Sequence, residues 1–228
     1  MNDLNTIILN IAQTLPGFLL AIVVHEAAHA WMANKFGDNT AKNEGRLTLN
    51  PAAHYDMFGT VLIPLLGAMT SSMVIGWARP VPIEPRKFKN YRSGVFWVSF
   101  AGPLSNLLLG TLSSFLIAVI VTQTSPTWEY YTIFIRMLSY SVFINFILAF
   151  FNLIPLPPLD GSKMVSSFLR GTTLYKYESI ARYTPIIFIV VILLSTQGLH
   201  VLGFIQTPAR IISNWLMFGF IGLMGGVA

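Results

Sequence analysis

The sequence contains no cysteine, and only 10% of its 228 residues are charged. The absence of cysteine excludes a disulfide framework and any metal site with thiolate ligands. Soluble globular domains usually carry about 25% charged residues, so a chain that is 54% hydrophobic and so poor in charge is not expected to be one. The composition indicates an integral membrane protein that crosses the bilayer several times.

Charge is missing over long stretches of the chain. Glu26 is the one Asp, Glu, Lys or Arg between residues 4 and 34, and there is none in residues 57–78, 93–128 and 137–159. Each stretch is long enough to enter or cross about 30 Å of hydrocarbon as a helix that rises about 1.5 Å per residue. The first residues, MNDLN, lack the basic segment of a signal peptide, so we expect the first apolar stretch to be retained.

These stretches predict a series of helices. We expect long helices at about 6–33, 94–122 and 131–155, an apolar segment at about 58–76, a short interfacial helix at 161–169, and C-terminal spans near 184–204 and 209–227. The segment GWARPVPIEP at 76–85 is different, because its prolines exclude a regular helix. It predicts an extended strand or a hairpin.

Residues 25–29 read HEAAH inside the first predicted helix. His25 and His29 are four positions apart, so they project from nearly the same face, about 40° apart, with Glu26 about 100° from His25. Two imidazoles so spaced can bind zinc, while the adjacent carboxylate can take a proton from water. A chance match or a pair of packing histidines is disfavoured, because an ionisable group deep in a membrane is costly and usually functional.

A catalytic zinc site usually has a third protein ligand. The candidate side chains are Glu44, His54, Asp56, Asp160, Glu178 and His200. Asp160 stands out because it follows helix-breaking prolines in FNLIPLPPLDG and precedes Gly161, which permits a tight turn. Taken alone, Asp160 would more often cap the helix that follows. In combination with His25 and His29, we interpret it as the third ligand.

Five motifs lie between residues 22 and 166: HEAAH at 25–29, GRLTLNPAAHYD at 45–56, GWARPVP at 76–82, AGPLSN at 101–106 and FNLIPLPPLDG at 151–161. Together they resemble the site-2 protease family of intramembrane zinc metalloproteases, in its compact prokaryotic branch without PDZ or CBS domain. The resemblance implies that His25, His29 and Asp160 bind one Zn²⁺, that Glu26 is the general base, and that Asn152 contacts the scissile peptide or the oxyanion. One departure is YDMFG after His54, where the family has a YDPxG-like turn.

A shared zinc site constrains the topology. His29 lies near the C-terminal end of the first helix and Asp160 just beyond the end of the helix at 131–155, so these two helices must run in the same direction. The helix at 94–122 supplies the one crossing between them. The segment at 57–76 must therefore re-enter and return to the side that it left.

The distribution of basic residues agrees with this topology. Loops 35–56, 79–92 and 161–182 contain twelve of the fourteen Lys and Arg residues, and the topology puts all three loops on one side. By the positive-inside rule that side is the cytoplasm. We expect the N-terminus outside, the C-terminus inside, and the active site nearer the cytoplasmic face of a prokaryotic plasma membrane.

The expected fold is an all-α polytopic membrane protein with about five transmembrane helices, a re-entrant segment at 57–76 and a membrane-associated β-hairpin or strand at 76–85. We expect a single domain over 1–228, with a catalytic core at about 6–170 and C-terminal spans at about 184–227. The expected function is hydrolysis of peptide bonds within or near transmembrane segments of membrane protein substrates, in regulated intramembrane proteolysis. The expected partners are that substrate and the lipid bilayer, with no nucleic acid.

The roles of several other polar or extended residues remain open at this level. Val81 and Ile83 could bind an unwound substrate by strand addition, or belong to a plain interfacial loop. His54 and Asn50 could contact substrate, orient a ligand or cap a turn. Asn106 is interpreted as a helix-packing residue. A zinc or proton transporter and a catalytically silent binding protein are the rival functions, both disfavoured by a single intact HExxH cluster.

Overall fold

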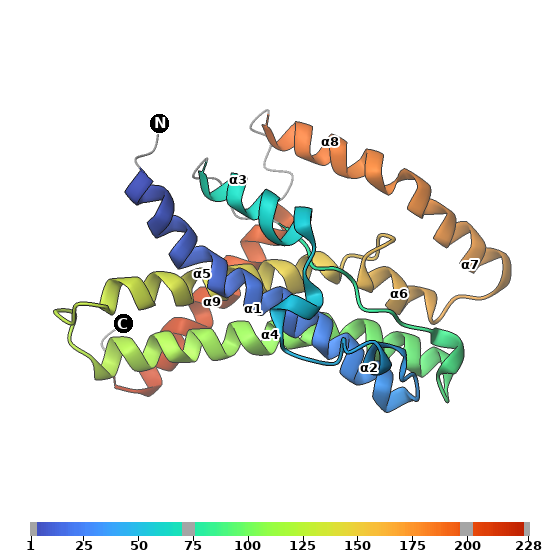
Figure 1. The fold of residues 1–228 in the computed structure, drawn as a ribbon, viewed down its shortest axis with the longest axis horizontal. Coiled ribbons are helices and arrows are strands. Elements are labelled where there is room, and N and C mark those ends of the chain that lie inside the picture. The colour runs from blue at the N-terminus through green and yellow to red at the C-terminus, as the bar shows by residue number, and fades with distance from the viewer. Residues whose placement is uncertain (1–3, 70–75, 197–202, 226–228) are drawn as a thin grey trace.

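The structure, a computed structural model, describes residues 4–69, 76–196 and 203–225, and all regular secondary structure in this part of the chain is helical (Figure 1). The longer helices are α1 (Leu4–Phe36), α4 (Tyr91–Gln123), α5 (Tyr131–Asn152), α8 (Thr184–Thr196) and α9 (Gly203–Leu223). The shorter ones are α2 (Thr40–Asn43), η1 (Pro51–His54), η2 (Met57–Leu62), α3 (Ile63–Met69), η3 (Pro85–Lys87), α6 (Asp160–Ser166), α7 (Gly171–Glu178) and η4 (Ser179–Tyr183). The all-α prediction is confirmed for the described residues.

Helices α1, α4 and α5 form the centre of the molecule. Among the described residues, these three are long and apolar enough to cross a membrane. They pack against one another, and α9 packs on α4 and α5, while α7 and α8 follow one edge of the molecule (Figure 1). The predicted count of five spans is not confirmed: α8 has 13 described residues, and the expected span at 184–204 includes residues 197–202, which lie outside the described part.

Glycines on α4 let its neighbours approach closely. A Cβ atom on Gly94 would collide with the ring of Phe88, and one on Gly110 would lie 3.1 Å from the ring of Phe146 on α5. Gly102, between them, faces the imidazoles of α1. Small residues of this kind are how membrane helices reach close contact. Here Gly102 lets α1, and Gly110 lets α5, approach α4 closely.

The segment at 57–76 begins as the π-helical turn η2 and continues as α3. Its residues 70–75 lie outside the described part of the chain. The N–H of Trp77 donates to the carbonyl of Gly59 at 3.1 Å, and the Thr60 hydroxyl donates to the Trp77 carbonyl at 3.1 Å. The chain at residue 77 is therefore back beside residue 59. This return supports a re-entrant path, which stays a prediction.

The predicted strand at 76–85 is not confirmed, because residues 76–84 have no regular secondary structure. Two prolines in this stretch, Pro80 and Pro82, have no N–H to give to a ladder. The N–H groups of Arg79, Val81 and Glu84 donate instead to the His54 carbonyl, the Glu26 carboxylate and the Asp38 carboxylate. The segment is extended, but its partners are loops and side chains.

Asp38 anchors one end of this extended segment. Its carboxylate accepts hydrogen bonds from the N–H of Glu84 at 2.6 Å and from the N–H of Thr40 at 2.9 Å. Burial raises the pKa of this carboxyl, but the hydrogen bonds from Thr40 and Glu84 and the charge of Lys87 outweigh burial and leave the pKa below its ordinary value. Asp38 therefore ties the loop after α1 to the segment before η3.

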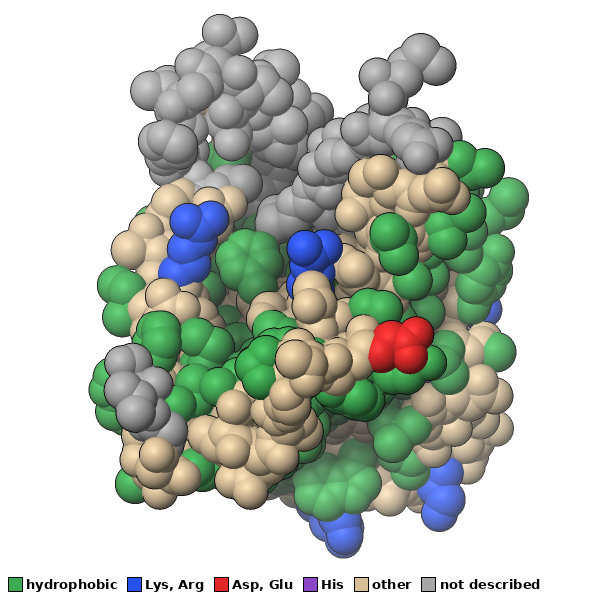
Figure 2. Space-filling view, turned by 90° about the vertical axis from the view of Figure 1, so that its left-hand side faces the viewer, with side chains coloured by type: hydrophobic (Ala, Val, Ile, Leu, Met, Phe, Trp, Pro, Cys, Tyr) green, Lys and Arg blue, Asp and Glu red, His purple; other side chains and the backbone are tan. Residues whose placement is uncertain are grey.

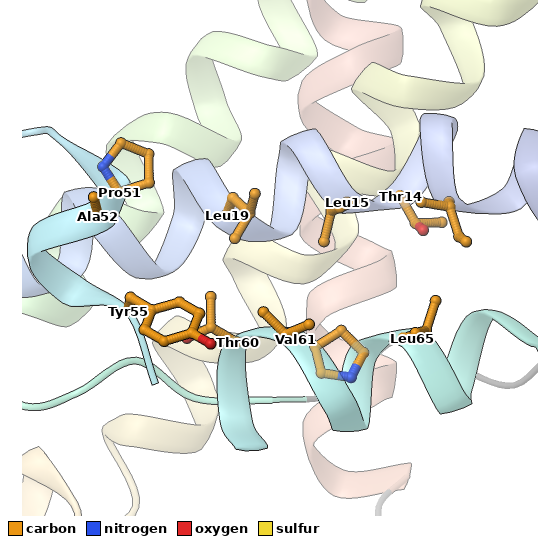
Figure 3. A pocket seen from close by; sticks show the side chains of 11 residues that line it. Thr14, Leu15, Leu19, Pro51, Ala52, Tyr55, Thr60, Val61 and Leu65 are labelled. Carbon is orange, nitrogen blue, oxygen red and sulfur yellow. The ribbon is translucent and has the colours of Figure 1, made fainter. Parts of the chain in front are cut away.

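Much of the molecular surface is apolar. Large hydrophobic side chains such as Leu108 and Leu112 on α4 are exposed, as suits contact with lipid. Figure 2 shows the face opposite α6, where hydrophobic side chains are spread widely, charges are isolated and no histidine is visible. A largely apolar pocket of about 270 Å³ lies between α1 and residues 51–65, with Leu15 and Leu19 facing Val61 across it (Figure 3). It has no metal-ligating residue in its lining.

Candidate metal centre

Three side chains from two distant parts of the chain meet at one point. Nε2 of His25 lies 3.1 Å from Oδ2 of Asp160, and Nε2 of His29 lies 3.2 Å from the same oxygen. The two Nε2 atoms are 3.1 Å apart. All three residues are buried. The structure therefore brings together the three residues that the sequence predicts as zinc ligands.

Two local features of the chain direct these side chains. His25 and His29 are one helical turn apart on α1, and their rings meet edge to face with centroids 4.6 Å apart. On the other side, α5 ends at Asn152, and α6 begins at Asp160 after a proline-containing turn. A Cβ atom on Gly161 would lie 2.5 Å from the carbonyl carbon of Leu153, so only glycine fits this turn.

Asp160 does not cap α6. The N-cap position is occupied by Leu159, and Asp160 is the first residue of the helix. Its carboxylate faces the histidines instead of the backbone of its own helix. The N-cap role considered for this residue from sequence alone is therefore wrong.

Hydrogen bonds at the far side of each ring set the tautomers. Nδ1 of His29 is 2.7 Å from the carbonyl oxygen of Val98, which can only accept, so this nitrogen carries the hydrogen. Nδ1 of His25 is 2.6 Å from Oδ1 of Asn106, whose amide nitrogen is engaged elsewhere, so it donates as well. With a hydrogen on Nδ1, each ring points Nε2, the atom that would bind a metal, toward Asp160.

This donor set fits zinc. Two imidazole nitrogens and a carboxylate oxygen, buried and in contact with one another, are ligands that zinc prefers. The edge of a tetrahedron with metal–ligand distances of about 2.0 Å is about 3.3 Å, close to the three observed separations. The donor atoms of His25, His29 and Asp160 all lie within 4.8 Å of one another. Three protein ligands would leave one position of a tetrahedral zinc ion open.

His25, His29 and Asp160 are called the metal group below. Glu26 lies beside this group and is held by the backbone of the extended segment at 76–84. Its Oε2 accepts the N–H of Val81 at 2.8 Å. The carbonyl of the same peptide unit, on Pro80, accepts a hydrogen bond of 3.3 Å from Nη2 of Arg46, which also binds the carbonyl of Arg79 at 2.5 Å. Arg46 and Glu26 thus hold the 80–81 peptide from its two sides.

Two cavities border the metal group, with volumes of about 300 and 360 Å³. Six residues line both of them: His25, Glu26, Pro80, Asn152, Pro158 and Leu159. Ser99 and Lys163 add polar atoms to the first cavity, whereas Trp77, Leu148 and Phe151 make the wall of the second largely apolar. Glu26 therefore borders both cavities.

The other residues singled out from sequence have varied positions. Asn152 lines both cavities, and its amide nitrogen donates to the carbonyl of Leu148 at 3.0 Å. Val81 and Ile83 line the first cavity. Asn50 caps η1, and His54 is buried with Nε2 at 2.9 Å from the carbonyl of Thr48. Neither Asn50 nor His54 is among the residues that line the two cavities, and His200 is outside the described residues.

Sequence reasoning missed two contacts at the metal group. Asn106, interpreted above as a helix-packing residue, touches His25 directly, and Gly102 leaves the space that both imidazoles occupy. Both belong to the motif AGPLSN at 101–106, so the signal was present, but it did not say toward which helix these residues point. The contact of His29 with Val98 is to a backbone carbonyl, so the residue type at position 98 does not indicate it.

Comparison with known proteins relates the chain to metallopeptidases. Residues 119–194 match Peptidase family M50, a range that includes Asp160 but not the two histidines. Putative zinc metalloprotease YwhC of Bacillus subtilis (strain 168) is 38% identical over 180 residues, which cover 75% of this chain and 76% of YwhC. Putative zinc metalloprotease Rip2 of Mycolicibacterium smegmatis is 28% identical over 188 residues, 82% of this chain and 68% of the relative. No solved structure matches the chain.

Proposed function

Because the chain belongs to peptidase family M50, the site-2 protease family of zinc metalloproteases, we propose that it hydrolyses peptide bonds within or near the transmembrane segments of membrane proteins. The observation that carries this proposal is the convergence of His25, His29 and Asp160 beside Glu26 at the junction of two cavities. We further propose that residues 1–228 act as one domain and that cleavage serves regulated intramembrane proteolysis.

The chemistry divides among the residues of the site. His25, His29 and Asp160 would hold zinc, which would supply polarisation of the scissile carbonyl and a more acidic attacking water. Glu26 accepts the proton from that water and later delivers it to the leaving nitrogen, a general acid–base role that contributes typically about 10²- to 10⁴-fold. The Val81 N–H occupies Oε2 of Glu26 and so keeps the carboxylate in one orientation, with its other oxygen available.

Asn152 has a separate role in the proposal. It lines both cavities, which puts its amide within reach of a peptide that lies between them. Without substrate, its Nδ2 donates to the Leu148 carbonyl of its own helix. Rotation of the side chain would redirect this donor to the oxyanion, where one such hydrogen bond is worth about 10²- to 10³-fold in kcat.

The residues available for strand addition are now fewer. An added strand needs both the N–H and the C=O of a residue on the receiving edge. The Val81 N–H is engaged by Glu26, and Pro80 and Pro82 have none. Within the described structure, Ile83 has neither backbone group in a hydrogen bond, and it lines the first cavity. We therefore propose Ile83 as the residue at which an unwound substrate pairs.

A single metal group favours an enzyme over a transporter. In the described part of the chain, His25, His29 and Asp160 are the one group of metal-binding geometry. A transport path would need ionisable groups at several depths. We also propose that the basic loops and the metal group lie toward the cytoplasm. Labelling of cysteines introduced at the exposed residues Glu44 and Lys87 tests this topology, because the chain has no native cysteine; labelling from opposite sides would contradict it.

The central experiment compares wild type with Glu26→Gln and with Glu44→Gln, a matched change at an exposed carboxylate. Each purified full-length protein is assayed on a panel of tagged transmembrane substrates, and its zinc is measured by elemental analysis. We expect about one zinc in all three proteins and cleavage that falls about 10²- to 10⁴-fold in Glu26→Gln alone. Cleavage by Glu26→Gln at the wild-type rate, or wild type without zinc, would refute the proposal.

A further inference from the structure

A chain of buried polar side chains leads from His25 into the middle of the bundle. Nδ1 of His25 is 2.6 Å from Oδ1 of Asn106 on α4, and Nδ2 of Asn106 donates to Oδ1 of Asn145 on α5 at 2.8 Å. Nδ2 of Asn145 donates to the carbonyl of Ser141 at 2.8 Å, and the Ser141 hydroxyl is 3.0 Å from that of Ser113. Both asparagines are fully buried, and both serines are buried.

The direction of each amide in this chain follows from its partners. Asn106 gives one amide hydrogen to the Ala21 carbonyl at 3.0 Å and the other to Asn145, so its oxygen must face His25. Asn145 gives its hydrogens to the carbonyl and the hydroxyl of Ser141, so its oxygen must face Asn106. The starting point is the Ser141 backbone carbonyl, whose direction α5 sets. The fixed direction of this carbonyl therefore sets the orientation of Asn145, which sets that of Asn106 and, through it, that of the His25 ring.

Helix packing alone does not account for this arrangement. Small or apolar residues could join α4 to α5 without a directional chain, as Gly110 and Phe146 do one turn away. A buried amide that lacks a partner is costly, and without Asn145 one amide hydrogen of Asn106 would be unpaired, so the Ala21 carbonyl alone would hold this side chain in its orientation. A turned Asn106 would present N–H to Nδ1 of His25 and would favour the tautomer with hydrogen on Nε2, the wrong one for a metal ligand.

We propose that Asn145 is a positioning residue, which acts through Asn106 to hold His25 in the tautomer and ring orientation that bind zinc. The inference rests on the zinc role of His25 and goes beyond the proposed function, since it concerns a residue that touches neither metal nor substrate. Removal of a hydrogen-bonding partner behind a metal-bound histidine typically weakens metal affinity about 10- to 100-fold. Asn145 is one hydrogen bond further from the histidine, so we expect a loss of about 10-fold for Asn145→Leu.

The conservative variant Asn145→Asp keeps the size of the side chain and can keep its hydrogen bonds to Asn106 and Ser141. In this apolar position the carboxyl would be protonated, with one oxygen accepting from Asn106 and the hydroxyl donating to the Ser141 carbonyl. Asn145→Asp should therefore keep zinc affinity within about threefold of wild type. The matched control is Ser113→Ala, which removes a buried polar contact between α4 and α5 at the end of the chain remote from His25. Its zinc affinity should not change.

The test measures zinc dissociation constants of purified full-length proteins by competition with a chelator of known affinity. The thermal midpoint of each metal-free protein is measured in parallel, and Asn145→Ser, whose hydroxyl is too short to reach Asn106, serves if Asn145→Leu does not fold. Weaker zinc binding in Asn145→Leu or Asn145→Ser, with affinity retained in Asn145→Asp and Ser113→Ala, supports the proposal. Equal affinity in all variants, or an equal loss in Ser113→Ala, overturns it.

Failure of this proposal can be distinguished from failure of the proposed function. The readout is zinc affinity and does not require cleavage of any substrate. If wild type does not bind zinc, the proposed function fails at its first step and the inference falls with it. If wild type binds zinc tightly and Asn145 variants do the same, only the role of Asn145 is refuted.

Discussion

Replacement of Gly102 by alanine should weaken zinc binding by at least about 100-fold while the bundle stays folded. Gly102 lies on α4 where that helix passes the two histidines of α1. Alanine is about 1 kcal/mol more favourable than glycine in a helix interior, so the substitution does not weaken α4 itself. Any loss of zinc affinity must therefore come from the contacts that the added methyl group makes with its neighbours.

The size of the effect follows from the geometry. A Cβ atom at position 102 would lie 2.6 Å from Cε1 of His25 and 2.6 Å from Cε1 of His29, and closer still to Nε2 of His29. Carbon atoms in contact are normally about 3.5–4.0 Å apart, so the rings must move by about 1 Å. Metal–ligand distances tolerate about 0.2 Å, so this shift takes at least one imidazole out of bonding range. We expect zinc affinity to fall by at least about 100-fold, beyond the loss for a residue behind a ligand.

The assay is zinc content and zinc affinity of the purified protein, with the thermal midpoint as the measure of folding. Gly219→Ala is the matched control, since a Cβ atom there would meet nothing within 4 Å. Gly110→Ala is a second control on the same helix, because it crowds Phe146 and not a histidine. If Gly102→Ala bound zinc as tightly as Gly219→Ala does, the packing of α4 against the imidazoles would be wrong.

Three further results are expected. Arg46→Met should lower kcat about 10- to 100-fold with zinc content unchanged, because the charged hydrogen bond that holds the peptide behind Glu26 is lost; an unchanged kcat would contradict this. Ile83→Pro should raise KM if substrate pairs at this residue. Val81→Pro also removes the N–H donor to Glu26 and should therefore lower kcat. Normal cleavage by Ile83→Pro would contradict strand addition. Because the folded pKa of Asp38 is depressed, its carboxylate stabilises the fold above about pH 4, and this contribution is lost as the pH falls through the folded pKa. Wild type should therefore have a higher Tm than Asp38→Asn at pH 7, and the difference should disappear in acid. A difference in Tm that persists at low pH would refute the stabilising role of the Asp38 carboxylate.

Much of the bundle was predictable because helical spans leave a local signal. A charge-free stretch of sufficient length predicts a membrane helix wherever it occurs, and α1, α4 and α5 appear close to their predicted ranges. The segment at 76–85 was harder, because an extended backbone becomes a strand only if a neighbour offers matching groups. Here the N–H of Val81 donates to the carboxylate of Glu26 instead of to a neighbouring strand. Pattern alone does not say which partner a backbone group will meet.

What the sequence by itself determined is the chemistry of the metal group. HEAAH on an apolar helix puts His25 and His29 on one face by the period of the helix, and the prolines before Asp160 end α5 where a carboxylate can follow. Only the tertiary structure decided how these side chains are oriented. The hydrogen bonds from His25 to Asn106 and from His29 to Val98 join residues 81 and 69 positions apart. Such contacts depend on the rotation and depth of whole helices, which no local pattern specifies.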